Sequence, residues 1–208
     1  MKRQSIILAG LVLVLAGTAV AQQKKAATAD PALVEKAIKG SWATAAPDWQ
    51  ARLAQDETQK ACSQYRNSPP KEVAEAIVKR EQAAIVYPAD GKLMGDWKNG
   101  EKLAESGYGG RYTDYPPRQV SGGNCYACHQ LAKAQVSFGT LGPSLLEYGK
   151  IRKYAEADVK AVYERIYNPH AAVACANMPR LGASKFLNID QIRDLVAYVM
   201  SPESPVNK

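Results

Sequence analysis

The feature that most constrains this chain is a five-residue motif, Cys125-Tyr126-Ala127-Cys128-His129, which occurs once in the 208 residues. Two thiols three positions apart can each add to one vinyl group of a porphyrin. A histidine that follows at once can place a ring nitrogen on the iron. The motif therefore predicts one covalently bound haem c, attached to Cys125 and Cys128, with His129 as an axial iron ligand.

The same cysteine spacing also occurs in redox dithiols and in zinc sites. Cys62, Cys175 and His170 stand elsewhere in the chain and could complete a set of zinc ligands on paper. Haem attachment is the favoured interpretation, and the zinc or dithiol alternative stays open at this point.

The N-terminus has the three parts of a secretory signal peptide. Lys2-Arg3 is the charged region, residues 6–15 are apolar, and Ala19-Val20-Ala21 has the small side chains of a cleavage site. We therefore expect residues 1–21 to be a signal peptide and the mature protein to be periplasmic.

Charge and hydropathy exclude two other classes of partner. The formal net charge is +7, but no run of five or more like charges and no alternation of basic and aromatic residues occurs, so we expect no nucleic-acid binding. No stretch approaches the roughly 20 apolar residues that a membrane-spanning helix needs, so we expect no membrane span.

The haem motif lies well past the middle of the chain, which indicates an N-terminal extension. Helical patterns occur at residues 31–39, 48–64 and 72–83, and Ser68-Pro69-Pro70 separates the last two because proline interrupts a helix. We expect residues 22–95 to form a helical extension without catalytic residues of its own.

Residues 96–208 are predicted to form the haem domain. The last helix has the strongest signal, because Asn188 and Gln191 can form a capping box before an apolar stripe. Gly100 in the first helix and Tyr198 in the last resemble the contact between the crossed terminal helices of class I cytochromes c. The expected fold class is all-α, a class I cytochrome c fold with a helical N-terminal extension.

The second axial ligand has two candidates. Met178 is followed by Pro179 in a loop-like stretch after the motif, and this Met-Pro pair resembles the distal ligand of class I cytochromes. A His/Met pair raises the reduction potential of the iron. The competitor is His170, which would give a bis-histidine haem but follows the helix-ending Asn168-Pro169, so we expect it on the surface.

Gly142-Pro143 also resembles a feature of class I cytochromes. There, the carbonyl of such a proline accepts a hydrogen bond from the ligand histidine and fixes its ring, as partners of metal-bound histidines generally do. Pro143 is the residue that we expect to orient His129.

Cys62 and Cys175 remain after the motif is assigned. An even leftover pair in an exported protein usually forms a disulfide. The alternative is a free thiol near the haem, which would be a candidate for sulfur chemistry.

From residue 56 to residue 198 the chain resembles SoxX, the monohaem cytochrome c subunit of the SoxAX complex of sulfur-oxidising bacteria. The resemblance is carried by four segments around the haem motif: Gln59-Lys60-Ala61-Cys62-Ser63, Gly122-Gly123-Asn124, Gly142-Pro143-Ser144-Leu145 and Asn177-Met178-Pro179-Arg180.

This resemblance implies a periplasmic complex that couples thiosulfate to a carrier-protein cysteine, an L-cysteine S-thiosulfotransferase. A SoxA-type subunit with a cysteine-ligated haem would hold the catalytic centre. This chain would contribute no catalytic residue, would accept electrons from that subunit and would pass them to a soluble cytochrome. A free-standing electron-shuttle cytochrome c and a haem enzyme or ligand sensor are the alternatives, and the last would need an open coordination position.

Overall fold

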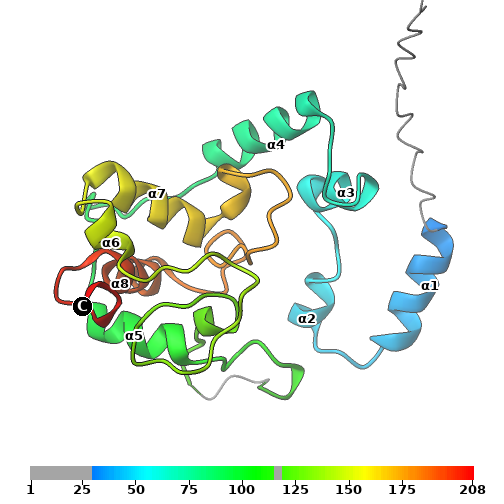
Figure 1. The fold of residues 1–208 in the computed structure, drawn as a ribbon. Helices are drawn as coiled ribbons and strands as arrows, with labels where there is room; N and C mark the ends of the chain where they lie inside the picture. Colours follow the sequence, from blue (N-terminus) through cyan, green and yellow to red (C-terminus); the bar gives the residue numbers. More distant parts are fainter. Residues whose placement is uncertain (1–29, 115–118) are drawn as a thin grey trace, which may run out of the picture.

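The computed structural model describes residues 30–114 and 119–208, and its regular elements are all helices (Figure 1). The predicted signal peptide lies outside these ranges. The α-helices are α1 (Pro31–Ser41), α2 (Pro47–Ala51), α3 (Glu57–Gln64), α4 (Lys71–Ala83), α5 (Trp97–Glu105), α6 (Tyr148–Ile151), α7 (Glu156–Tyr167) and α8 (Ile189–Met200). Four short 3₁₀ helices are η1 (Tyr112–Asp114), η2 (Cys125–Ala127), η3 (Pro169–Ala171) and η4 (Pro205–Asn207). None of the described helices is long and apolar enough to cross a membrane.

The two helices that frame the haem domain begin where the sequence predicts. The Asp96 side chain accepts from the backbone N–H of Lys98 at 2.8 Å and caps α5. At the start of α8, Asn188 and Gln191 form the complete capping box. These caps satisfy backbone donors that the helix itself leaves unpaired.

α5 and α8 cross closely, as expected, and Gly100 is the residue that permits it (Figure 1). A Cβ atom at Gly100 would lie 2.0 Å from the backbone oxygen of Asp194 and 2.8 Å from Cβ of Tyr198. Both distances are far below van der Waals contact, so only glycine lets the two backbones approach this closely. The predicted contact between Gly100 and Tyr198 is confirmed.

The extension has one break that the periodicity does not reveal. The stretch expected as one helix over 48–64 is two helices, α2 and α3, because Asp56 starts a new helix instead of continuing one. The Asp56 side chain accepts a hydrogen bond from the Gln59 backbone N–H at 2.8 Å, and the Gln59 side chain accepts one from the Asp56 backbone N–H. This capping box has the same design as the one before α8.

The segment between α4 and α5 packs onto the haem domain. Ile85 is buried in the main core. The ring of Tyr87 stacks on Tyr163 of α7 with centroids 5.6 Å apart, and the Tyr163 hydroxyl donates to the carbonyl of Val86 at 2.7 Å. The extension is therefore joined to α7 by a packed segment of chain.

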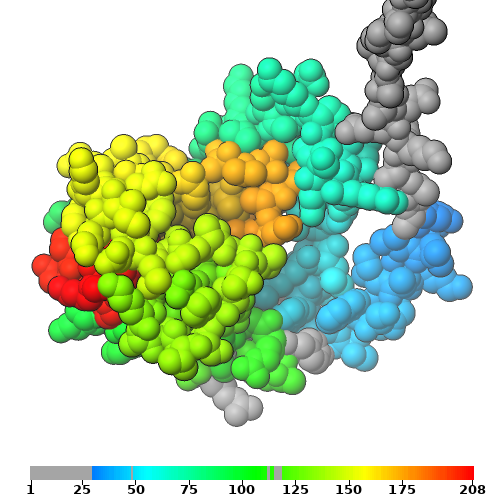
Figure 2. Space-filling model, in the orientation of Figure 1, coloured from blue at the N-terminus to red at the C-terminus, as the bar shows by residue number. Residues whose placement is uncertain are grey.

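A disulfide between Cys62 of α3 and Cys175 makes the second connection between the extension and the haem domain. The two Cα atoms are 5.4 Å apart and the residues are separated by 113 positions. The predicted disulfide is confirmed, so neither sulfur is a free thiol. In the space-filling view, the orange surface around residue 175 meets the teal and cyan surface of α3 and α4 (Figure 2).

Candidate functional site

The haem motif forms a single tight turn. Asn124 adopts a left-handed conformation with φ 48°, η2 follows, and the His129 backbone N–H bonds the Cys125 carbonyl at 2.9 Å. Residues three and four positions apart lie on one face of such a turn. Both thiols and the imidazole are thus presented on the same side.

Contacts from both terminal helices hold this turn in place. The Gly123 backbone N–H donates to the carbonyl of Leu103 in α5 at 2.7 Å. Inside the motif, the hydroxyl of buried Tyr126 lies 2.7 Å from that of Tyr198 in α8, and burial together with this hydrogen bond raises the pKa of Tyr198. Tyr126, one of the two residues between the motif cysteines, therefore ties the motif to the crossed helices.

The loop that follows the motif folds back along it. Three backbone hydrogen bonds join the two segments: Gly139 to Tyr126 at 2.8 Å, Gly142 to Cys128 at 2.8 Å and Leu145 to Gln130 at 2.7 Å. This pairing brings Gly142-Pro143 onto the ring of His129.

The orientation of His129 is fixed by that loop. Its Nδ1 atom lies 2.8 Å from the Pro143 carbonyl oxygen. Since a carbonyl only accepts, Nδ1 carries the proton and Nε2 keeps its lone pair for a metal. A Cβ atom at Gly142 would lie 2.3 Å from Cε1 of the ring, so a side chain there would displace the imidazole. The expected hydrogen bond from His129 to the Pro143 carbonyl is present.

Neither motif cysteine forms a disulfide. Burial raises the pKa of the Cys125 thiol to about 12, and the side chain packs against the main core. A zinc ligand must be a thiolate, and Cys62 and Cys175 are consumed in their disulfide. This arrangement of the motif cysteines suits thioether bonds to a haem, and it disfavours a zinc site completed by Cys62, Cys175 and His170.

Met178 lies on a loop between η3 and α8, three residues after the disulfide. Its side chain is half-buried against the same core cluster as Cys125. A cavity of about 380 Å³ opens between the two segments, lined by Gly123 and Asn124 next to the motif and by Pro179 and Leu181 next to Met178. These lining residues are sequence neighbours of the motif and of Met178, whereas the motif cysteines, His129 and Met178 themselves do not line this cavity.

The extension lines the same cavity. Trp49 of α2 forms part of its wall, and the Arg52 guanidinium lies 4.5 Å from the centre of the Trp49 ring. The space between the motif and the Met178 loop is thus bordered by three parts of the chain.

The expectation that His170 is a surface residue is wrong. His170 belongs to η3 and is only 7% exposed, because α4 packs over this short helix. Burial and the nearby charge of Arg180 lower its pKa, although Glu81 opposes this. Nδ1 of its ring has no hydrogen-bond partner in the described part of the chain.

Two features of the site escape sequence reasoning. Tyr126 occupies a variable position of the motif, and its partner Tyr198 is 72 residues away. Glu81 of α4 and Arg180 of the Met178 loop form an ion pair between the extension and the haem domain. Only the pair of leftover cysteines signalled that these regions meet.

Comparison with known proteins assigns the class. A family model described as Cytochrome c matches residues 117–202, so this chain contains a cytochrome c domain. The domain confirms the predicted all-α cytochrome c fold, implies covalently bound haem c and indicates electron transfer.

The relative found for the chain is described as an uncharacterized lipoprotein from Aquifex aeolicus (strain VF5). It is 42% identical over 161 residues, which cover 76% of this chain and 75% of that protein. The aligned length exceeds the haem domain, so the similarity includes part of the extension.

The residues present fit the haem that the family implies. Cys125 and Cys128 would hold it covalently, Nε2 of His129 is available as a ligand, and Met178 packs against the same core cluster as Cys125. A bound haem supplies one-electron chemistry, since its iron alternates between two oxidation states. The chain's own contribution is to orient His129 through Pro143 and to surround the group with the core.

Proposed function

We propose that this protein is a SoxX-like electron-transfer subunit of a periplasmic thiosulfate-oxidising complex, carrying one haem c with His129 and Met178 as axial ligands. The proposal rests on the cytochrome c domain together with the longer sequence pattern, from the Cys62 segment to the Met178 segment. The disulfide supports it, since it shows that the extension and the haem domain form one unit.

The reaction of the complex defines what this chain must do. Thiosulfate and a carrier-protein thiol lose one proton and two electrons as a sulfur–sulfur bond forms between them. A single haem takes up one electron at a time, so this chain would relay the two electrons in succession from a SoxA-type subunit to a soluble cytochrome.

The observation that carries the proposal is the fixed geometry on the motif side of the haem site. His129 is held by Pro143 at 2.8 Å, and the second ligand candidate, Met178, packs against the same core cluster as Cys125 of the motif. With both axial positions filled by side chains, no position remains for a substrate. This favours electron transfer over a haem enzyme or a ligand sensor.

Exposed residues beside the motif offer a surface for partners. Val136 is 93% exposed and Leu141 is 73% exposed, and both belong to the loop that is hydrogen-bonded to the motif. Nearby Lys133 and Lys150, with side chains about 60% exposed, both bridge Glu147 at 3.0 Å. Apolar side chains with lysines around them suit an acidic redox partner.

The proposed location follows from the N-terminus and from the relative. Residues 1–21 have the pattern of a signal peptide, and the Aquifex aeolicus protein is described as a lipoprotein, a class of exported proteins. Covalent haem attachment and the disulfide both suit an oxidising compartment.

Reconstitution tests the role. The isolated holoprotein, a SoxA-type subunit and their mixture are each assayed with thiosulfate, carrier protein and an electron acceptor. Turnover should require the SoxA-type subunit and rise when this chain is added. Substantial turnover by this chain alone would place the chemistry here and overturn the relay assignment.

Purification from a native periplasm separates the proposal from a free-standing electron shuttle. A subunit of a complex should co-elute with a second haem protein through size exclusion, whereas a shuttle should elute as a single chain.

A further inference from the structure

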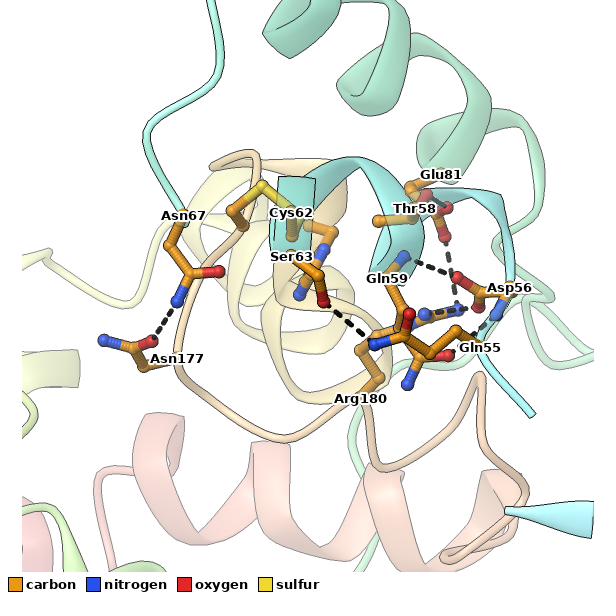
Figure 3. The surroundings of a disulfide bond; sticks show 12 residues. Gln55, Asp56, Thr58, Gln59, Cys62, Ser63, Asn67, Glu81, Asn177 and Arg180 are labelled. Atoms are coloured by element: carbon orange, nitrogen blue, oxygen red, sulfur yellow. Dashed lines mark hydrogen bonds and ion pairs between the residues drawn. A yellow bond between two sulfur atoms is a disulfide. The ribbon is translucent and has the colours of Figure 1, made fainter. Parts of the chain in front are cut away.

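The loop that carries Met178 is attached to the extension on both sides of the methionine. Before it, the disulfide joins Cys175 to Cys62 of α3. After it, Nη1 of Arg180 lies 2.6 Å from Oδ2 of Asp56, the cap of the same helix (Figure 3). Residues 175 and 180 are thus both fixed to α3, and Met178 lies between them.

A buried carboxylate from the extension supports the second attachment. Glu81 of α4 is only 6% exposed and accepts hydrogen bonds from Thr58 of α3 and from Asn168, the latter at 2.6 Å. Nη2 of Arg180 approaches it at 3.6 Å. The guanidinium therefore lies between two carboxylates that belong to α3 and α4.

Both carboxylates are held in their charged form. Burial by itself would raise the pKa of Glu81, but the hydrogen bonds from Thr58 and Asn168 and the charge of Arg180 outweigh it, and the pKa is lowered. For Asp56, backbone hydrogen bonds and Arg180 outweigh burial in the same way. Ion pairs with this degree of burial and hydrogen bonding are stronger than surface pairs.

The haem domain itself holds the loop after Arg180, because the backbone N–H groups of Gly182 and Ala183 donate to the Tyr167 carbonyl at 3.0 Å and Leu181 is buried in the main core. Before Arg180, the backbone hydrogen bonds of the loop are short-range turns, from Val173 to Pro169 and from Ala176 to Val173. A segment held only by such turns would sample many conformations, and each ligand contact would have to offset that entropy. Attachment at residues 175 and 180 limits this freedom around Met178 before any bond to iron forms.

We propose that α3 and α4 are a positioning device for the axial ligand Met178, and that Arg180 is the positioning residue, acting through Asp56 and Glu81. This inference rests on the proposed ligation of the haem iron by Met178. It assigns to the extension a role in setting the strength of the methionine–iron bond.

The experiment compares two arginines of equal exposure, of which only Arg180 has a buried carboxylate, Glu81, among its partners. Arg180 and Arg193 each have a side chain that is 20% exposed, and each pairs with two carboxylates. Arg193 lies in α8, far along the chain from Met178, and pairs with Asp90 and Asp190. Arg180→Gln tests the positioning role, and Arg193→Gln is the control for loss of a half-buried ion pair.

The measurement is competition by imidazole for the ferric iron of the holoprotein. Loss of charge-assisted bonds from Arg180 should free the loop and tighten apparent imidazole binding by roughly tenfold. Arg193→Gln should change it by no more than about twofold, even if thermal stability falls equally in both variants. The red charge-transfer band of methionine-ligated ferric haem should weaken only in Arg180→Gln.

Asp56→Asn keeps the inference testable if Arg180→Gln fails to fold. Asparagine caps helices as well as aspartate does, so α3 keeps its start while the charge facing Arg180 is lost. This variant should also bind imidazole more tightly than the parent protein. Equal imidazole affinities for Asp56→Asn and the parent, or for the two arginine variants, would overturn the positioning role.

Met178→Ala separates this inference from the proposed function. If Met178→Ala leaves the ferric spectrum and imidazole affinity unchanged, Met178 is not the ligand and both proposals fall. If Met178→Ala abolishes the charge-transfer band while Arg180→Gln matches Arg193→Gln, only the positioning role is refuted.

Discussion

The two sides of the haem site are built in different ways. On the motif side, His129 bonds Pro143, which is 14 residues away, and the whole turn is held by contacts inside the haem domain. On the Met178 side, the fixed points are Cys62–Cys175 and Asp56–Arg180, with separations of 113 and 124 residues. One side is local and the other depends on the extension.

This difference separates attachment of the haem from control of its iron. The motif side supplies the covalent bonds and one ligand from a turn that the haem domain holds by itself. On the other side, the proposed ligand Met178 would supply a thioether, and the strength of its bond to iron would depend on the position of the loop. An extension whose disulfide and Asp56–Arg180 ion pair both reach this loop could alter ligation without altering attachment.

Met178→Ala should have the largest effect, because it removes the proposed second ligand. The low-spin ferric spectrum should become high-spin or show another sixth ligand. The reduction potential should fall by on the order of 0.1 V or more, within the range of roughly 0.8 V that axial ligands span. Optical and spin-resonance spectra with a redox titration measure this, and an unchanged ferric spectrum would make His170 the candidate.

Loss of the disulfide should have the second-largest effect. It should weaken mainly the ligation by Met178. The bond closes a span of 113 residues, and a loop of this size is worth roughly 4–5 kcal/mol at most in the chain-entropy model. Urea unfolding of the protein with Cys62 and Cys175 both changed to Ser should start at lower urea. Methionine ligation should be lost before helical structure, whereas coincident transitions would show that the disulfide stabilises both sides equally.

The motif side was predictable because its signals are local. Spacing identified the haem motif and the cap at Asn188, since each depends on residues within a single turn. The role of Pro143 and the crossing at Gly100 were foreseen from the resemblance of these residues to features of class I cytochromes c.

On the Met178 side, only the leftover pair Cys62 and Cys175 predicted that the extension contacts the loop. The pairing of Glu81 with Arg180 depends on how α4 packs over η3, and no short-range pattern reports this. For the same reason His170 was expected on the surface. A histidine after a helix-ending Asn-Pro usually lies in solvent, but here another helix covers it.

A smaller effect on the motif side should follow from Gly142→Ala. The added methyl group would overlap the His129 ring, and such overpacking typically costs about 1–3 kcal/mol. The yield of holoprotein should fall and the His129 orientation should change in spin-resonance spectra. Gly40→Ala in α1 is the matched control, because a Cβ there meets nothing within 4 Å. Equal behaviour of the two variants would mean that the ring is not held by this loop.

The smallest effect should be the contribution of Glu81 to the pH dependence of the free energy of unfolding. Its pKa in the folded protein lies below the ordinary value of 4.5. The stabilisation by its charged form is therefore complete above pH 4.5 and is lost as the pH falls through the folded pKa. Glu81→Gln should be less stable than the parent by about 1–2 kcal/mol at pH 7, and the difference should shrink towards zero in acid.

Neighbouring groups do not obscure this comparison. The pKa of Asp56 is lowered in the folded protein, so protonation of Asp56 in acid destabilises the fold. The pKa of His170 is also lowered, so the folded protein loses stability as the pH falls below 6.5, the ordinary pKa of histidine. Both groups titrate in the parent and in Glu81→Gln, so the difference between the two proteins keeps only the coupling of Glu81 to them, through which Glu81 raises the pKa of His170. Glu147→Gln, which breaks only exposed lysine pairs, should show almost no difference at either pH. Urea unfolding at pH 7 and at pH 3.5 measures all three proteins, and a difference for Glu81→Gln that stays constant with pH would show that its charge does not hold Arg180.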